Sequence, residues 1–387
     1  MMNRRQRTLA ALDHKEPDRV PLDFGGRHTT LHLFAHEALM RHLGLTGPKP
    51  SIRSYHTYLV EPDPQLLRRF ERVSVSFFPK APSGYVLRID PTTNTFVDEW
   101  GTTYYMPPNG YYYDIHAVPL PEAETAADLA RYRWPNPTDS GRIAGLPEQI
   151  RATYVAGENV IIMCGAMPGL WEHSWYMFGV EKAFMNLAGS EPLMEALTER
   201  ILEWQIAYWD MVLSQVGACV DLVQLNEDLG SQHGLMMSPA TFRRLYKPRL
   251  RRLIASIKQK TAARIYLHSC GSIYRLIPDL IEIGVQVLNP VQVNAVEMDS
   301  VRLKREFGKD LTFWGGGCDP VIMGTGTVQQ VRDEVKRRIH DLAPGGGFVF
   351  GSVHNIQANV PPENIVAMFD AARDLGSYPI TSQRSAR

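Results

Sequence analysis

The sequence Tyr266-Leu267-His268-Ser269-Cys270-Gly271 stands between a short apolar run and an amphipathic segment. The apolar run at 264–267 predicts a buried strand, and the spacing of apolar residues over 273–283 predicts a helix. A strand that turns through glycine into a helix is a unit of α/β folds. This unit also leaves an imidazole and a thiol at the end of the strand, and zinc favours both as ligands.

The same alternation of short apolar runs and helical segments occupies much of the chain. Most of these runs are followed by a predicted helix, and a further helix is predicted over residues 1–12. Eight such units predict a (β/α)₈ barrel with an N-terminal helical extension. An open, doubly wound sheet is the alternative, but no G-x-G-x-x-G sequence follows an early strand, which argues against its dinucleotide-binding form. The predicted strands are residues 19–24, 73–77, 159–164, 220–226, 264–267, 285–288, 311–314 and 347–350. The predicted helices include residues 169–188, 239–260 with a kink at Pro248, 328–342 and 362–375, and residues 44–63 are predicted to form a loop.

Residues 82–121 interrupt the alternation. Runs at 86–89, 95–100 and 103–105 read as short antiparallel strands, and Pro107-Pro108-Asn109-Gly110 reads as a turn. We expect a β-hairpin insertion after the second strand of the barrel. Because barrels routinely exceed about 250 residues as one unit, we expect residues 1–387 to form a single domain that contains this insertion.

Composition restricts the classes of partner and compartment. Lys plus Arg and Asp plus Glu number 41 each, so charge gives no reason to expect binding to nucleic acid or membranes. Residues 1–19 lack the apolar core of a signal peptide, and no run approaches the roughly 18 apolar residues of a membrane span. The four cysteines (164, 219, 270 and 318) fit no disulfide framework. We expect a cytoplasmic protein and leave a homodimer open.

Polar residues gather where the predicted strands end, which is where barrel enzymes place their chemistry. His268, Cys270, His354 and Glu227 come from three different strand ends and form a ligand set typical of zinc. Cys318, after three glycines, is an alternative ligand. The competing interpretation makes these histidines and cysteines ordinary core residues.

Other polar residues at strand ends are candidates for catalysis or substrate binding. Glu227 and Asp228 suit general acid–base work, although an acidic pair also suits the start of a helix. Arg27 follows the first predicted strand and suits an anionic group of a substrate. The candidates for the substrate pocket are His173, Asn289 and Gln292, and His173 is equally compatible with the core.

Several of these segments together resemble the uroporphyrinogen decarboxylase superfamily, and the resemblance extends over nearly the whole chain. It implies a (β/α)₈ barrel and one of two chemistries: decarboxylation without a cofactor, or zinc-dependent methyl transfer with a corrinoid protein. The segments are Asn226-Glu227-Asp228-Leu229-Gly230-Ser231-Gln232, His268-Ser269-Cys270-Gly271-Ser272, Asn289-Pro290-Val291-Gln292 and His354-Asn355-Ile356-Gln357.

The departures from the decarboxylase pattern favour the methyltransferase branch. Where decarboxylases carry Arg-Gln-Ala-Gly-Arg, this chain has Gly25-Gly26-Arg27-His28, and Ser76-Phe77-Phe78 stands where their catalytic Asp is expected. The methyltransferases use His-x-Cys plus a distant Cys, which points to His268 and Cys270, with His354 at the third position. The resemblance also implies a carboxylate on the fourth strand, which points to Glu227.

We therefore expect a zinc-dependent methyltransferase, similar to O-demethylase components, that moves a methyl group between a small substrate and a corrinoid, with a methoxylated aromatic compound as one candidate substrate. The chain has no Asp-x-His-x-x-Gly corrinoid signature, so the corrinoid is expected on a separate partner protein. One alternative is a metal-independent decarboxylase of a small carboxylic acid, with Arg27 holding the carboxylate. A third interpretation is a non-catalytic protein that binds a methyl group or a corrinoid protein.

Overall fold

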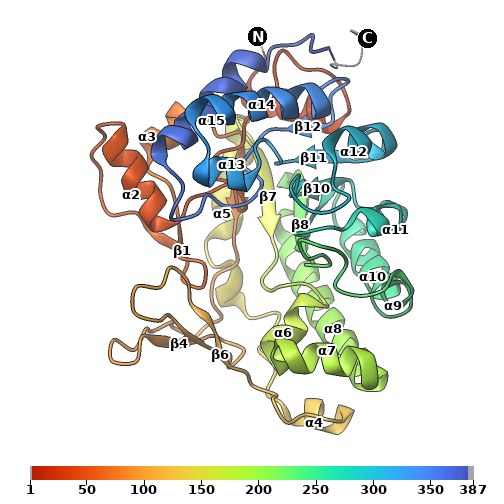
Figure 1. Cartoon of the computed structure of the whole chain (residues 1–387). Coiled ribbons are helices and arrows are strands. Elements are labelled where there is room, and N and C mark those ends of the chain that lie inside the picture. Colours follow the sequence, from red (N-terminus) through yellow and green to blue (C-terminus); the bar gives the residue numbers. More distant parts are fainter. Residues whose placement is uncertain (1, 382–387) are drawn as a thin grey trace.

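A curled parallel sheet organises the computed structural model, which describes residues 2–381. Its seven strands lie in the order β12-β11-β10-β9-β8-β7-β3, and every neighbouring pair is parallel. Helices surround this sheet (Figure 1), as the predicted barrel requires. The strands are β3 (Ser74–Phe77), β7 (Val160–Cys164), β8 (Leu222–Asn226), β9 (Arg264–His268), β10 (Val287–Asn289), β11 (Thr312–Trp314) and β12 (Phe348–Val349).

The first predicted strand, residues 19–24, takes the eighth place of the barrel without becoming a regular strand. Leu22 forms a single parallel bridge with Phe350 beyond β12. The Asp23 amide donates to the Phe350 carbonyl at 2.7 Å, and Ser74 on β3 donates to the Asp23 carboxylate at 2.6 Å. Pro21 has no N–H to extend the ladder. The prediction of a regular strand was therefore wrong, whereas the placement beside β12 follows the barrel prediction.

The helices lie mainly outside the sheet, and a large apolar cluster fills the space between the two layers. Short 3₁₀ turns occur at Ser140–Ile143, Gly217–Cys219 and Tyr274–Leu276. Among the described helices, none is long and apolar enough to cross a membrane. The helices are α1 (Arg4–Leu12), α2 (Leu33–His42), α3 (Pro64–Arg69), α4 (Ala126–Arg131), α5 (Leu146–Ala156), α6 (Glu172–Phe178), α7 (Val180–Gly189), α8 (Glu191–Val216), α9 (Pro239–Thr241), α10 (Lys247–Lys258), α11 (Ile277–Glu282), α12 (Ser300–Phe307), α13 (Pro320–Thr325), α14 (Val328–Leu342) and α15 (Pro362–Leu375).

Two long predicted helices are interrupted at identifiable residues. The segment predicted over 169–188 divides into α6 and α7 at Gly179, which has φ +84°, a value that glycine adopts without strain. The segment predicted over 239–260 contains a π-helical turn, Phe242–Tyr246, directly before α10. Pro248 in the first turn of α10 lacks an N–H donor, which explains why the predicted irregularity falls there.

The barrel interior is a second apolar cluster, built from residues that alternate along the strands. Val160, Ile162 and Cys164 of β7 point into it, and Tyr266 of β9 joins them. Ala11 and Leu12 of α1 belong to the same cluster, so the N-terminal helix covers one end of the barrel. Because side chains alternate with a period of two, His268 lies one layer beyond Tyr266, at the opposite, carboxyl end.

Two small antiparallel sheets stand outside the barrel (Figure 1). The segment between β3 and α4 contains β4 (Thr95–Val97), β5 (Thr103–Tyr105) and β6 (Asp114–Ala117). The predicted strand at 86–89 is absent there, and β6 was not predicted because it is largely exposed and lacks an apolar run. The second sheet, β1 (Ile52–Ser54) with β2 (Leu59–Val60), was expected to be a loop.

Candidate metal centre

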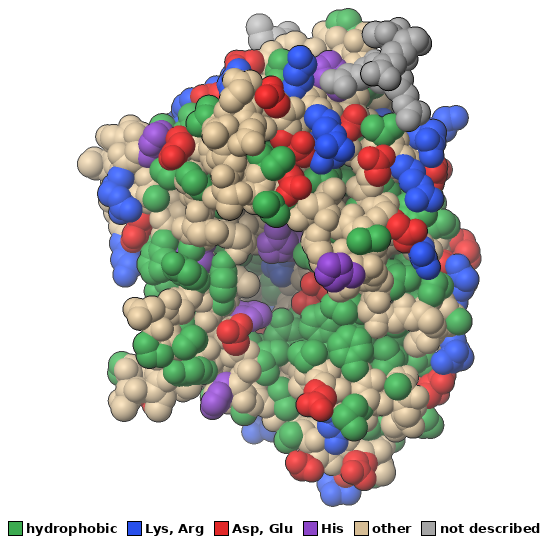
Figure 2. Space-filling model, in the orientation of Figure 1, with side chains coloured by type: hydrophobic (Ala, Val, Ile, Leu, Met, Phe, Trp, Pro, Cys, Tyr) green, Lys and Arg blue, Asp and Glu red, His purple; other side chains and the backbone are tan. Residues whose placement is uncertain are grey.

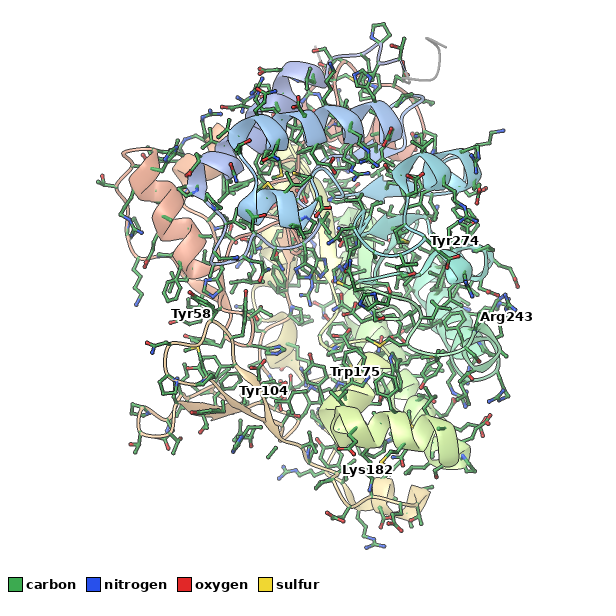
Figure 3. All side chains as sticks on the ribbon, in the orientation of Figure 1. Tyr58, Tyr104, Trp175, Lys182, Arg243 and Tyr274 are labelled. Carbon is green, nitrogen blue, oxygen red and sulfur yellow. The ribbon has the colours of Figure 1, made fainter. Side chains whose placement is uncertain are left out.

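A cavity of about 640 Å³ opens at the carboxyl ends of the barrel strands. Figure 2 shows it as a hollow in which histidine side chains are visible. Its floor includes Asp228, His268 and His354, and its walls come from the β1–β2 hairpin, the 82–121 segment and α6. Tyr104 and Trp175, two of the wall residues, are labelled in Figure 3. The cavity therefore lies where the barrel prediction placed the site.

Three predicted ligands meet at this end of the barrel, and two of them, His268 and His354, line the cavity. One ligand atom each from His268, Cys270 and His354 lies within 4.8 Å of the other two. His268 ends β9, Cys270 follows it by two residues, and His354 follows β12, so the barrel brings them together across 84 residues of sequence. Two imidazoles and a thiol in such proximity form a donor set that suits zinc. Neither Glu227 nor Cys318 belongs to this cluster.

The hydrogen bonds of Asn289 decide which nitrogen of His268 is available to a ligand. The Asn289 Nδ2 donates to the Trp314 carbonyl at 2.9 Å, so its Oδ1 is the acceptor that faces His268 Nδ1 at 2.6 Å. Nδ1 must then carry the proton. The lone pair is left on Nε2, which lies 3.4 Å from Cys270 Sγ. Such outer hydrogen bonds commonly orient metal-binding histidines, so Asn289 is a positioning residue.

The turn after β9 is held by contacts to its backbone. The Cys270 amide donates to Asp228 Oδ1 at 2.9 Å, and the Gly271 amide donates to Gln292 Oε1 at 2.7 Å. Gly271 has φ +82°, and a Cβ there would lie 2.4 Å from the Gly230 carbonyl carbon. A side chain would therefore be both strained and obstructed. Gln292, predicted to line the pocket, instead supports this turn and is not among the cavity-lining residues.

Burial sets the charge state of the ligand cluster. It lowers the pKa of His268 and of His354 to about 4, so both rings are neutral at neutral pH. Burial, with the nearby Asp228 and Glu172, raises the pKa of the Cys270 thiol. Neutral imidazoles are ready to bind a metal, whereas the thiol must lose its proton on binding. The residues present thus fit a zinc ion.

Two carboxyl groups in the cavity have pKa values raised by burial. Burial, followed by the charges of Asp228 and Glu227, raises the pKa of Glu172 well above its usual value. Burial also raises the pKa of Asp228, against the opposing effects of the Cys270 amide and His354. Both line the cavity. Glu172 was missed from the sequence because only its neighbour His173 was singled out.

Glu227 points away from the cluster. Its Oε1 accepts from the Trp171 amide at 2.9 Å, and a Cβ on Gly169 would lie 1.5 Å from its Oε2. Burial raises its pKa to about 8, so it is mainly protonated at neutral pH. Glu227 therefore supports the loop before α6, which resembles the alternative role at the start of a helix. Asp228 is the carboxylate that lies beside the cluster.

Cys318 and His173 also lie apart from the cavity lining. Cys318 is buried in the outer core, where Glu334 and Arg338 of α14 are its charged neighbours. His173 packs edge-on against Trp100 with ring centroids 4.4 Å apart. Burial lowers its pKa to about 3. Its surroundings match the core interpretation.

Arg27 lies where the sequence placed it, in the cavity wall. Its guanidinium stacks on Phe78, with Cζ 5.3 Å from the ring centroid. Among residues 2–381, its buried Nε has no hydrogen-bond partner. Arg53, on the same ring at 5.1 Å, is instead paired with Glu61. Arg27 is therefore the guanidinium with donor capacity left for a bound anion.

His28 is a cavity residue that the sequence reasoning missed. Its ring stacks on His268 with centroids 3.6 Å apart and planes 13° apart, and it lies 6.0 Å from His354. The residue is 7% exposed and lines the cavity. Its position after the first predicted strand, next to Arg27, was the available signal.

Comparison with known proteins places these features in a family. The uroporphyrinogen decarboxylase (URO-D) family pattern matches residues 103–375. The methylcobamide:CoM methyltransferase MtaA of Methanosarcina barkeri is 28% identical over 198 residues, covering 50% of this chain and 52% of that protein. A uroporphyrinogen decarboxylase of Neisseria meningitidis serogroup C is 26% identical over 167 residues, covering 42% and 44%. The chain thus matches about half the length of these curated relatives.

A solved structure agrees with the fold over almost its entire length. A methyltransferase from Methanosarcina mazei superposes with a TM-score of 0.63 at 20% identity, covering 97% of this chain and 99% of that one. At this identity the likeness concerns the fold alone. The match of the family pattern over most of the chain shows more: the protein belongs to the uroporphyrinogen decarboxylase (URO-D) family.

Proposed function

We propose that the protein is a zinc-dependent methyltransferase that moves a methyl group between a heteroatom of a small substrate and the corrinoid of a partner protein. The observation that carries the proposal is the His268–Cys270–His354 cluster, in which His268 and His354 line the cavity. The relatives named as methylcobamide:CoM methyltransferases support the choice of this branch of the family.

The residues in and around the cavity then have distinct roles. His268, Cys270 and His354 would hold zinc, which when bound lowers the pKa of a coordinated thiol or hydroxyl or polarises a methoxy oxygen. Asn289 keeps the His268 lone pair on Nε2, and Asp228 fixes the Cys270 backbone. Arg27 binds an anionic group of the substrate.

The carboxyl pair, Asp228 and Glu172, accounts for the proton. A heteroatom that gives up a methyl group gains a proton, and one that accepts a methyl group loses it. Both carboxyl groups line the cavity and have pKa values raised by burial, so they are the groups placed to give or take that proton.

The substrate is proposed to be small and partly aromatic. Phe78, Phe96, Tyr104, Trp175 and Tyr176 line the walls of the cavity, and aromatic side chains favour stacking against flat rings. A methoxylated aromatic compound fits such walls. The chain lacks a corrinoid signature, so we assign the corrinoid to a separate protein that docks at the cavity mouth.

Metal analysis of purified protein tests this proposal first. We expect about one zinc per chain, lost in Cys270→Ala, as structural and catalytic zinc sites depend on every protein ligand. Methyl transfer is then followed by the absorbance of free methylcobalamin with thiol acceptors, and of cob(I)alamin with methoxylated aromatic donors. A folded, zinc-free protein with full activity would exclude the proposal.

A second candidate is a metal-independent decarboxylase of a small carboxylic acid. The free donor capacity of Arg27 in the cavity and the family's decarboxylase members favour it. In that case Arg27→Leu abolishes carbon dioxide release, whereas Cys270→Ala leaves it intact. The opposite pattern supports methyl transfer.

A further inference from the structure

The imidazole of His268 needs more than one hydrogen bond to keep its lone pair aimed at the ligand cluster. Asn289 fixes the position of Nδ1, but rotation of a histidine ring about its last side-chain bond is soft and broadly distributed. A ring held at one edge can tilt, and a tilt moves Nε2 off the ligand cluster. Contacts on the ring face must therefore oppose the tilt.

His28 supplies such a contact. Its ring lies 3.6 Å from the His268 ring and within 13° of parallel, which is close packing of two flat groups. It is also within 12° of parallel to Tyr266, one layer deeper in the barrel, at 6.4 Å. His28 thus lies nearly parallel to the two inward side chains of β9 and packs directly against His268.

The turn that carries His28 is itself well held. The Gly26 amide donates to Thr29 Oγ1 at 2.9 Å, and this hydroxyl donates to Asp23 Oδ2 at 3.0 Å. Thr29 and Asp23 are 1% and 2% exposed. Asp23 is anchored in turn by Ser74 and by the indole of Trp314. A buried network therefore fixes the backbone on which His28 stands.

A hydrogen bond from Nδ1 does not explain the presence of His28 against His268. Its Nδ1 is buried and has no hydrogen-bond partner among residues 2–381, and a buried polar atom without a partner costs stability. What the contact with His268 uses is the flat shape of the ring.

We propose that His28 is a positioning residue that holds the plane of His268 and thereby raises the affinity of the His268–Cys270–His354 cluster for a metal ion. This inference rests on the proposed metal site. It adds a residue on the first segment of the barrel to a site whose ligands come from β9 and from the loop after β12.

Cobalt(II) titration of the metal-free full-length protein tests the proposal, since cobalt occupies zinc sites and its visible absorption reports ligand geometry. His28→Leu fills the space without a flat ring, and His28→Phe keeps the flat ring without nitrogens. We expect His28→Leu to weaken cobalt affinity about 10-fold or more and to alter the spectrum, and His28→Phe to stay within about threefold of wild type.

Thr29→Val provides a second route that leaves the cavity side chains unchanged. By releasing the Gly26 turn, it should shift the cobalt spectrum in the same direction as His28→Leu, so the test stands even if His28→Leu fails to fold. Unchanged cobalt affinity and spectra in Thr29→Val, and in His28→Leu where it folds, overturn the inference alone. Equal losses in His28→Phe and His28→Leu also overturn it, whereas a wild-type protein that binds no cobalt overturns it together with the proposed function.

Discussion

The two nitrogens of His268 have different surroundings, and that difference decides what the ring can bind. Nδ1 faces the Asn289 amide oxygen, and Nε2 faces Cys270 Sγ. A single amide thus sets the tautomer of a ligand that the sequence had identified, although the sequence assigned Asn289 to the substrate pocket. The residue type alone left the role of Asn289 open, and its buried neighbours, His268 and Trp314, determine it.

The contact between Asn289 and His268 can be tested by removing the acceptor. Asn289→Leu should weaken zinc affinity by about 10- to 100-fold, because the ring loses its orienting hydrogen bond. Asn289→Asp keeps an acceptor and should retain affinity within about 10-fold. Competition with a chromophoric chelator measures both, and equal affinities for wild type and the Leu variant would contradict the assignment.

Glu227 offers a test in pH-dependent stability. Its folded pKa is about 8, above the usual value of 4.5, because burial disfavours the charge. The folded protein therefore binds more protons than the unfolded chain between about pH 4.5 and 8, so its stability should fall through this window by up to about 1.4 kcal/mol per pH unit. Above pH 8 this contribution should level off.

Glu227→Gln removes that ionisation while keeping the shape of the side chain. The difference in free energy of unfolding between wild type and variant, measured by urea denaturation at pH 5.5, 7 and 8.5, should change steadily in favour of the variant. Parallel profiles would show that Glu227 is ionised in the folded protein. The zinc content of Glu227→Gln should equal that of wild type. A loss of zinc in this variant would instead support the prediction that Glu227 is a metal ligand.

Among the elements, the turn between β9 and α11 carries the site, and its shape depends on close backbone packing. The amides of Cys270 and Gly271 are both held by side chains from other strand ends. The insertion and the β1–β2 hairpin add walls above this turn. This short turn therefore positions one candidate ligand, and its shape depends on the loops after β8 and β10.

Gly271→Ala should be far more harmful than an ordinary glycine substitution. The positive φ and the approach to Gly230 predict a loss of about 3 kcal/mol or more, with reduced zinc content in the remaining folded protein. The matched control is Gly189→Ala at the end of α7, where a Cβ meets nothing within 4 Å. It should change stability by at most about 1 kcal/mol. Similar effects of both substitutions in denaturation experiments would contradict this account.

In the whole molecule, the residues that stabilise the barrel core with α1 and the residues of the candidate site lie at opposite ends of the barrel. Ala11 and Leu12 of α1 pack into the barrel interior at one end, whereas the cavity and the ligand cluster occupy the other. This division is usual for barrel enzymes. Substitutions at the α1 end should therefore affect folding without changing the site.

Leu12→Ala tests this separation. It should lower the free energy of unfolding by about 2–5 kcal/mol, because a buried side chain leaves a cavity. Zinc per folded chain and cobalt spectra should match wild type. Leu12→Met, which conserves volume, should cost less than about 1.5 kcal/mol. A changed cobalt spectrum in a folded Leu12→Ala protein would show that the two ends are coupled.

The parts of the structure that the sequence predicted well have strong local signals. β7 is a continuous apolar run, β8 and β9 are mostly apolar, and α14 and α15 have the predicted bounds of residues 328–342 and 362–375. The segments at the edges of the sheets were harder to predict. The segment at 19–24 pairs through one bridge, and β1, β2 and β6 are too short or too exposed to leave a pattern. Pairing of such segments depends on distant partners.

The amino-acid sequence by itself determined the alternating architecture and a set of candidate ligands, His268, Cys270, His354, Glu227 and Cys318, because periodic burial and ligand type are local properties. Only the tertiary structure decided which residues surround these candidate ligands. It placed Asp228 beside Cys270, turned Glu227 towards the loop before α6, left Cys318 and His173 in the core, and stacked His28 on His268. The physical reason is that neighbouring residues at a strand end point in different directions, and only packing of the closed barrel fixes which of them face the cavity.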